Sequence, residues 1–215
     1  ITGAASGIGA AVARAFDAAG ARVVLSDRDE AGLAVTLRSL RGANSAMVLP
    51  FDVTEFERHA ALAALVKARM GRIDLLFNIA GITQRSLVRD TGMDVYRRLM
   101  DVDYFAPVSL TKAVLPIMAA DGGGTVAVVS SVAGKFGTAL RSGYCAAKHA
   151  LHGFYDSLRA EAWSDNIKVT VVVPASVRTN VSVNAIRGDG SPYGVMDDAM
   201  AQGQSADEAA AITVS

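Results

Sequence analysis

Apolar residues along the chain alternate between short runs rich in β-branched residues and longer segments with helical spacing. Each short run predicts a β-strand, and the clearest runs cover 22–26, 46–49, 73–77, 125–129 and 168–173. These runs are apolar nearly throughout, which is typical of strands that helices cover on both faces. Because strands and helices alternate, we expect the strands to be parallel. The pattern therefore predicts a single doubly wound α/β sheet.

Two of the predicted helices show their ends in the sequence. The first begins at a glycine cluster and ends before Gly20, a residue type that commonly caps a last turn. The second is predicted over 54–70, with Thr54 as N-cap and Glu57 three residues later in a capping-box pattern. We expect His59, on this second helix, to be solvated. The apolar stripe of the first helix consists of Ile8, Ala11, Val12, Ala15 and Phe16.

The second half of the chain contains a long helix and a long loop. The helix is predicted over 93–118, with a kink near Pro107 and a stop near Pro116. Residues 175–205 are rich in Gly, Asn, Asp and Ser, and long irregular segments of this kind are typically binding loops. We therefore interpret 175–205 as a substrate-binding loop within one domain that spans 1–215.

Composition narrows the classes of partner. The 215 residues, 51% of them hydrophobic, are enough to bury one sizeable core. The 21 basic and 21 acidic residues cancel, so a small-molecule substrate fits better than a nucleic acid or an anionic membrane. Cys145 is the only cysteine, and no apolar run approaches the roughly 20 residues of a membrane helix. We expect a cytoplasmic location and no membrane contact by this segment.

The glycine cluster at the start of the chain carries the first candidate chemistry. Gly3, Gly7 and Gly9 stand between a predicted strand end and a helix start, where a chain without Cβ atoms can approach a pyrophosphate. An ordinary glycine-rich turn is the alternative interpretation. Asp27 follows Gly9 by 18 residues at the end of the next strand, close to the spacing at which a carboxylate accepts from a ribose 2′-hydroxyl. This spacing favours a dinucleotide site.

The residues at the end of that strand also bear on the choice of cofactor. Asp27 would accept the 2′-hydroxyl of NAD and repel the 2′-phosphate of NADP, whereas Arg28 could pair with that phosphate. Because the carboxylate stands at the strand end itself, we expect it to dominate. The sequence predicts NAD, with NADP as the less favoured cofactor.

Ser131, Tyr144 and Lys148 form a second constellation. Tyr144 and Lys148 are four residues apart and share one helix face, where a lysine cation favours the phenolate form of a tyrosine. Ser131 follows a predicted strand and could hydrogen-bond the oxygen that exchanges a proton with Tyr144. In the alternative interpretation Tyr144 is an amphipathic core residue and Lys148 is a solvated charge.

These motifs together resemble the short-chain dehydrogenase/reductase family over nearly the whole chain. The first motif is similar to the family's Thr-Gly-x-x-x-Gly-x-Gly, and the others to its Asp-Val, Asn-Asn-Ala-Gly, active-site Ser and Tyr-x-x-x-Lys. The corresponding residues here are Thr2 to Gly9, Asp52-Val53, Asn78-Ile79-Ala80-Gly81, Ser130-Ser131 and Tyr144-Cys145-Ala146-Ala147-Lys148. The resemblance implies a Rossmann fold and an NAD(P)-dependent oxidoreductase that transfers a hydride between nicotinamide and a carbonyl or secondary alcohol.

The resemblance also implies individual roles. Tyr144 would be the acid/base, Ser131 would orient the substrate, and Lys148 would bind the nicotinamide ribose while favouring the phenolate. Members of the family commonly pack their two longest helices together, which implies a homodimer or homotetramer. The remaining cofactor contacts would come from Gly3, Ser6, Gly7, Ile8, Gly9, Asp27, Arg28, Asp52, Val53, Asn78, Ala80, Gly81, Pro174, Val177 and Thr179.

The chain departs from the family pattern at two positions and at its ends. Asp103 stands where the family usually has an active-site Asn. A carboxylate near Lys148 would offset that cation, whereas a protonated Asp103 would mimic the amide. We therefore expect Asp103 to take part in catalysis but to slow turnover. Ala175 replaces a usual Gly, so alanine would be strained if that position needs a positive φ. Related chains usually have a strand before Thr2 and another after Ser215, so we expect the native protein to be longer.

Two classes of function remain open. The preferred class is an enzyme; its rival is a catalytically weak sensor or scaffold that keeps the dinucleotide fold. We expect no metal site, because His149 and His152 lack a third ligand at metal-binding spacing.

Overall fold

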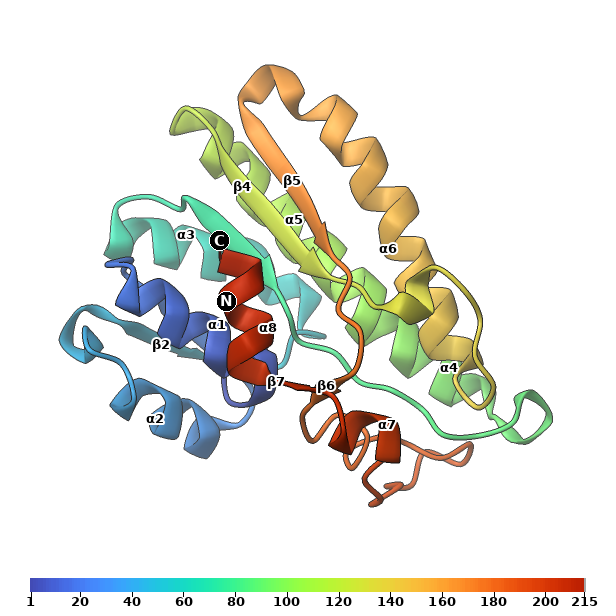
Figure 1. Ribbon diagram of the computed structural model, residues 1–215. Coiled ribbons are helices and arrows are strands. Elements are labelled where there is room, and N and C mark those ends of the chain that lie inside the picture. The colour runs from blue at the N-terminus through green and yellow to red at the C-terminus, as the bar shows by residue number, and fades with distance from the viewer. Residues whose placement is uncertain (215) are drawn as a thin grey trace.

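The computed structural model describes residues 1–214, and its two larger parallel sheets have their strands in the predicted places (Figure 1). The strands β1 and β2 pair with each other, and β3, β4 and β5 form a second sheet in that order. Each overlaps a run predicted from the sequence, so the doubly wound parallel α/β fold is confirmed. The strands are β1 Val24–Asp27, β2 Met47–Pro50, β3 Leu75–Asn78, β4 Gly124–Val129 and β5 Ile167–Val172.

The first two residues bridge the gap between the two sheets. Thr2 forms a parallel bridge with Ser26 of β1, and its backbone N–H donates to the carbonyl of Phe77 in β3 at 3.0 Å. Behind them a cavity of about 350 Å³ lies between the facing edges, lined mostly by apolar side chains that include Val24 and Leu75.

Helices cover both faces of the sheets (Figure 1). On one face α1 Gly7–Ala18 packs against α8 Ala206–Val214, with α2 Glu30–Arg38 beside β1 and β2. On the other face are α3 His59–Met70, α5 Ala106–Ala120 and α6 Ser142–Glu161. Their largest shared core includes Leu62, Leu110, Val126, Tyr155 and Val169. Among residues 1–214 no helix is both long and apolar enough to cross a membrane.

The predicted start of the second helix is wrong. A 3-10 turn, Phe56–Arg58, precedes α3, and side chains bind the backbone N–H groups of the residues just before that turn. Asp52 accepts from the N–H of Thr54 at 2.9 Å, and Glu55 accepts from the N–H of Asp52 at 3.0 Å. The later start turns His59 inward: the ring is 1% exposed, with Nδ1 2.8 Å from the Ser109 hydroxyl. The expectation that His59 is solvated is therefore also wrong.

The predicted long helix is divided into three parts. These are α4 Met93–Met100, a π-helical segment Asp101–Phe105, and α5. Pro107 lies in the first turn of α5 and cannot donate to the carbonyl four residues earlier, so the helix widens before it instead of kinking at it. Pro116 lies inside α5 and does not end the helix. The π-helical segment matters for function because it carries Asp103, which is buried.

The loop predicted over 175–205 contains some regular structure. A two-residue strand, β6 Val177–Arg178, pairs in parallel with β7 Gln204–Ser205, and α7 Asp198–Ala201 lies between them. The irregular part between β6 and α7 is held to the rest of the protein by Ile186, which bridges Gln84 and Pro192. Its role in binding substrate stays a prediction.

Candidate active site

The glycine motif packs directly against the segment that follows β3. A Cβ on Gly3, whose φ is +70°, would lie 2.9 Å from the backbone nitrogen of Ala80. A Cβ on Gly9 would lie 2.0 Å from the Gly3 carbonyl oxygen, so α1 approaches the loop only because both residues are glycine. The Thr2 hydroxyl accepts from the N–H groups of Ile79 and Ala80 at 3.0 and 3.2 Å. The first and third sequence motifs therefore share one edge of the structure.

The start of α1 offers backbone donors to a ligand. Ser6 is the N-cap, and its side chain makes no capping hydrogen bond. The first N–H groups of a helix have no partner within the helix, so those of Gly7, Ile8 and Gly9 are available to an anion. Gly7 also packs against Thr179, where a Cβ would lie 3.1 Å from the Thr179 methyl carbon. This end of α1 can hold a phosphate.

Asp27 and Arg28 take different directions at the end of β1. The two Asp27 oxygens accept from the N–H groups of Ala5 and Asp29 at 3.2 and 3.1 Å, so this carboxylate is fixed next to the glycine motif. Arg28 reaches instead to Asp52, with 3.4 Å between Nη1 and Oδ2. Partial burial raises the pKa of Asp52, but hydrogen bonds from Thr54 and the charge of Arg28 leave it below its usual value.

Arg28 and Asp52 line a cleft of about 330 Å³. Val102, in the π-helical segment, closes it on the other side. Val53, the other half of the predicted Asp-Val pair, is buried at 9% exposure. The other residues that line this cleft are Thr54, Asp94, Arg97, Arg98 and Asp101.

Lys148 is the centre of the second constellation, and the interpretation of it as a solvated charge is wrong. Its side chain is 5% exposed, and Nζ lies 3.3 Å from Asp103 Oδ1. Nζ also donates to the carbonyl of Val129 at the end of β4, at 3.0 Å, and lies 5.6 Å from the centre of the Tyr144 ring. Burial lowers the pKa of Lys148, but Asp103 and then Tyr144 raise it above its usual value, so the amine stays protonated.

Asp103 is completely enclosed beside Lys148. Its Oδ1 also accepts from the N–H of Ile82 at 3.2 Å, whereas Oδ2 has no hydrogen-bond partner among residues 1–214. A Cβ on Gly81 would lie 2.6 Å from Oδ1, so glycine is needed there for the carboxylate to fit. Burial raises the pKa of Asp103 to about 6, against the attraction of Lys148. The carboxyl therefore changes charge close to neutral pH, which an Asn could not do.

Ser131 lies at the carboxyl end of β4 and begins a 3-10 turn, Val132–Gly134. Its Oγ accepts from the N–H of Ala133 at 3.1 Å, which leaves its own O–H free to donate. The preceding Ser130 is buried, donates to the Lys148 carbonyl at 3.2 Å and lies 3.0 Å from His152 Nε2. The strand end that carries Ser131 is thus tied to the helix that carries Lys148.

Sequence reasoning missed Gln84. This side chain is completely buried, and its Oε1 accepts from the N–H groups of Gly143 and Tyr144 at 2.7 and 3.3 Å. It therefore caps the start of α6 from a different part of the chain. The only signal in the sequence is its place three residues after Gly81, within a segment already assigned to the site.

Asn78 contacts the core with its side chain. Nδ2 donates to the hydroxyl oxygens of Thr111 and Tyr155, each at 3.3 Å, so the amide points away from the glycine motif. The cofactor contact predicted for Asn78 is therefore left to its backbone, and it stays a prediction. Tyr155 is 0% exposed, and its hydroxyl donates to the carbonyl of Pro107 at 3.2 Å. Burial raises the pKa of Tyr155 far above its usual value.

We expect Tyr155→Phe to lower the free energy of unfolding by about 1–3 kcal/mol, because Asn78 and Thr111 lose a buried partner. Urea denaturation measures this change. Tyr193→Phe, in a partly exposed position outside the cluster, is the matched control and should have a much smaller effect. Equal stability of Tyr155→Phe and the unmodified protein would contradict the structural role of this hydroxyl.

The end of β5 closes the site. The Pro174 carbonyl accepts from the N–H of Val132 at 3.3 Å, and Val177 is buried. Among the non-glycine residues of 1–214, only Leu140 and Asn166 have a positive φ. Ala175 therefore does not carry the left-handed strain that would follow if this position needed a glycine. Pro174, Val177 and Thr179 therefore lie on one short segment whose last member packs on Gly7.

Comparisons with known proteins agree with this arrangement. The family model described as short chain dehydrogenase matches residues 1–189. The mouse protein Dehydrogenase/reductase SDR family member 7B is 44% identical over 98% of this chain, which spans 67% of the mouse protein. A short-chain dehydrogenase from Streptomyces avermitilis has 33% identity and a TM-score of 0.88, over 100% of this chain and 80% of that one.

A second crystal structure extends the comparison of the fold alone. It is a short chain dehydrogenase/reductase from Burkholderia phymatum in complex with NAD, with 24% identity and a TM-score of 0.89, over 100% of this chain and 83% of that one. The family match, the mouse relative and the motifs gathered at one edge of the sheets lead to the same assignment. This chain belongs to the short-chain dehydrogenase family and is a nicotinamide-dependent oxidoreductase that acts on small molecules.

Proposed function

We propose that Tyr144 is the acid/base of this enzyme and that the reaction interconverts a carbonyl compound and a secondary alcohol with NAD as the cofactor. One observation carries the proposal: the buried Lys148 amine lies 5.6 Å from the centre of the Tyr144 ring. A cation so close to a phenol, and shielded from water, favours proton transfer through the phenolate. The nicotinamide supplies or accepts the hydride when it is bound.

Each of the other residues has a distinct role in this proposal. In the reducing direction Tyr144 donates its proton to the carbonyl oxygen, and it takes the proton back during oxidation. Ser131 donates its free O–H to the same oxygen and holds it in place. Lys148 keeps its charge beside Tyr144 and reaches the ribose of the nicotinamide. The free N–H groups at the start of α1, where Ser6 makes no cap, support pyrophosphate binding.

The preference for NAD over NADP rests on Asp27. Its carboxylate is fixed beside the glycine motif, where it would accept from a ribose hydroxyl and repel a phosphate, whereas Arg28 is paired with Asp52. We expect a lower Michaelis constant for NADH than for NADPH, and Asp27→Ala should narrow the difference by about tenfold or more. Steady-state rates with both cofactors measure this. A lower Michaelis constant for NADPH with the unmodified protein would overturn the preference.

Turnover itself is the test of the enzyme against its rival, the cofactor sensor. Purified protein is mixed with NADH and a panel of ketones, and the loss of NADH absorbance is followed. We expect consumption of NADH with at least one ketone. NADH binding without consumption across the panel would favour the sensor.

Two further proposals concern the assembly and location of the enzyme. We propose a homodimer or homotetramer through the outer faces of α5 and α6, where Phe154 of α6 is only partly buried and Phe105, immediately before α5, is 47% exposed. Light scattering on the purified protein gives the mass that tests this.

A cytoplasmic location is also proposed, supported by the free thiol of Cys145, and microscopy of a tagged full-length protein tests it.

A further inference from the structure

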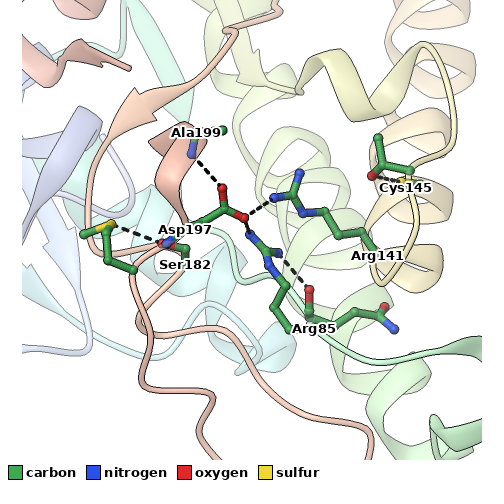
Figure 2. A network of polar contacts seen from close by, with 9 residues as sticks. Arg85, Arg141, Cys145, Ser182, Asp197 and Ala199 are labelled. Atoms are coloured by element: carbon green, nitrogen blue, oxygen red, sulfur yellow. Dashed lines mark hydrogen bonds and ion pairs between the residues drawn. The ribbon is translucent and has the colours of Figure 1, made fainter. Parts of the chain in front are cut away.

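Asp197, in the predicted substrate-binding loop, contacts two arginines from other parts of the chain (Figure 2). Its Oδ2 lies 2.9 Å from Nη2 of Arg85 and 3.0 Å from Nη2 of Arg141. Arg85 follows β3, and Arg141 immediately precedes α6. One carboxylate oxygen therefore joins the loop to both segments that flank Tyr144. We call Arg85, Arg141 and Asp197 the arginine clamp.

The arginine clamp is shielded from water on the Arg85 side. The Arg85 side chain is 5% exposed, and those of Arg141 and Asp197 are 21% and 24% exposed. Two cations share one anion in this cluster. The pKa of Arg85 is lowered, mainly because the side chain is buried and also because the positive charge of Arg141 lies nearby. A carboxylate at position 197 is therefore required for a guanidinium to remain at this depth. An ion pair shielded in this way is screened less than an exposed one, so it holds the loop more firmly than a surface ion pair would.

The loop holds Asp197 in a fixed orientation. Its Oδ1 accepts from the N–H of Ala199 at 3.1 Å at the start of α7, and its own N–H donates to the Ser182 hydroxyl at 3.2 Å. Ser182 is completely buried and donates in turn to the sulfur of Met196 at 3.3 Å. Asp197 therefore connects Ser182, near the start of the irregular segment, with α7 at its end. A shift of this carboxylate would displace both parts of the loop.

The other side of the arginine clamp is continuous with the start of α6. The Arg141 carbonyl accepts the first hydrogen bond of the helix, from the N–H of Cys145 at 2.8 Å. The residue before it, Leu140, has a φ of +66°, a left-handed conformation that is strained for leucine. Its carbonyl accepts from the N–H of Ser86 at 3.1 Å. The strained turn directs Arg141 toward the loop, and the ion pair with Asp197 helps to maintain it.

Gln84 connects the arginine clamp to Tyr144. Its backbone carbonyl accepts from Nη1 of Arg85 at 2.9 Å, and its side chain binds the N–H of Tyr144 at 3.3 Å. The guanidinium that holds the loop and the backbone that carries the proposed acid/base are therefore attached to one buried residue. Gln84 thus joins the loop to the start of α6, while its shorter hydrogen bond, to the N–H of Gly143 at 2.7 Å, holds the helix start in place without the loop.

We propose that Asp197 is a positioning residue that fastens the 175–205 loop over the substrate through Arg85 and Arg141, and thereby sets the affinity for substrate. The proposal rests on the function proposed above, because it assigns this loop to the wall of that active site. Asp197 touches no reacting atom. Asp197 keeps the loop closed and attached to the start of α6. It therefore acts on substrate binding more than on proton transfer.

The experiment compares Asp197→Asn, Arg141→Gln and the double variant with Asp198→Asn, an exposed neighbouring carboxylate, as the control. With a ketone that the unmodified enzyme reduces, we expect Asp197→Asn to raise KM by about tenfold or more and to change kcat by less than about threefold. The double variant should be no worse than Asp197→Asn, because that change already breaks the contact with Arg141. The dissociation constant of NADH should not change.

Arg141→Gln keeps the Arg85–Asp197 pair, so it remains informative if Asp197→Asn fails to fold. Trypsin provides a readout that needs no turnover, since Arg178 and Arg187 are exposed within the loop. We expect cleavage there to be about tenfold faster in Arg141→Gln than in the unmodified protein, with no change in global stability. Unchanged KM and unchanged cleavage in both single variants would overturn the proposal. If the unmodified protein reduced no ketone but cleavage were still accelerated in the variants, the result would count against the proposed reaction and leave the loop contact supported.

Discussion

Replacing Tyr144 with Phe is expected to lower kcat/KM for ketone reduction by about 10²- to 10⁴-fold, the range typical of a lost acid/base group. Phe keeps the ring beside Lys148 but has no proton to exchange with the carbonyl oxygen. NADH affinity should remain close to that of the unmodified enzyme, because the glycine motif and Asp27 are untouched. Steady-state kinetics and a fluorescence titration with NADH measure the two quantities.

Tyr155→Phe is the informative comparison for this variant. Both tyrosines lie on α6, but the Tyr155 hydroxyl is enclosed by Thr111, Asn78 and the Pro107 carbonyl and cannot reach a substrate. We expect Tyr155→Phe to lose stability and keep its turnover once folded, and Tyr144→Phe to show the opposite. If Tyr144→Phe retains more than about a tenth of the activity, another group must transfer the proton.

Asp103→Asn is expected to raise kcat for alcohol oxidation by about tenfold near neutral pH. In the unmodified enzyme the carboxylate 3.3 Å from Lys148 offsets the cation that favours the phenolate. An amide removes that negative charge, so the midpoint of the pH–rate profile should move down by about one pH unit, which is a tenfold change in the active fraction. The profile of kcat against pH for both proteins measures the shift.

The pH dependence of stability gives a second measurement on the same pair. Burial raises the pKa of Asp103 to about 6 from 3.8, so the folded protein holds this proton more tightly than the unfolded chain does. The contribution to the free energy of unfolding is therefore fully present below about pH 4 and is lost as the pH rises through 6. The free energy of unfolding of Asp103→Asn should not show this decrease between pH 4 and pH 6. Identical rates and identical stability profiles for the two proteins would show that Asp103 stays uncharged or exerts no influence on Lys148.

The site residues differ in how far the sequence could identify them. The sequence motifs single out Gly3, Gly9 and Gly81, and the structure shows that a close approach of backbone or side chain leaves room only for glycine at each; their contact with the cofactor stays a prediction. Asp103 was also named, but its complete burial and its unpartnered oxygen depend on the π-helical segment. That segment arises where Pro107 withholds a backbone N–H, and helical periodicity by itself does not reveal it.

Other features depend on contacts between distant residues. Gln84 caps the start of α6 across 59 residues of sequence, and Asp197 meets Arg85 across 112. Neither contact leaves a local signal, because a polar residue in a loop pattern looks the same whether it is solvated or enclosed. The burial of His59 has a local cause instead. The capping pattern at Thr54 and Glu57 predicts an early helix start, but in the structure Asp52 and Glu55 bind backbone N–H groups there and the helix begins later.

The sequence by itself determined the order of strands and helices, the parallel sheet and the family, because hydrophobic periodicity and motif spacing are local properties. The tertiary structure alone decided which polar groups are enclosed together: Lys148 with Asp103, Asn78 with Tyr155, and Asp197 with its two arginines. The physical reason is that the charge state and the strength of such groups depend on burial and on partners far along the chain, which only the folded arrangement brings within hydrogen-bond distance.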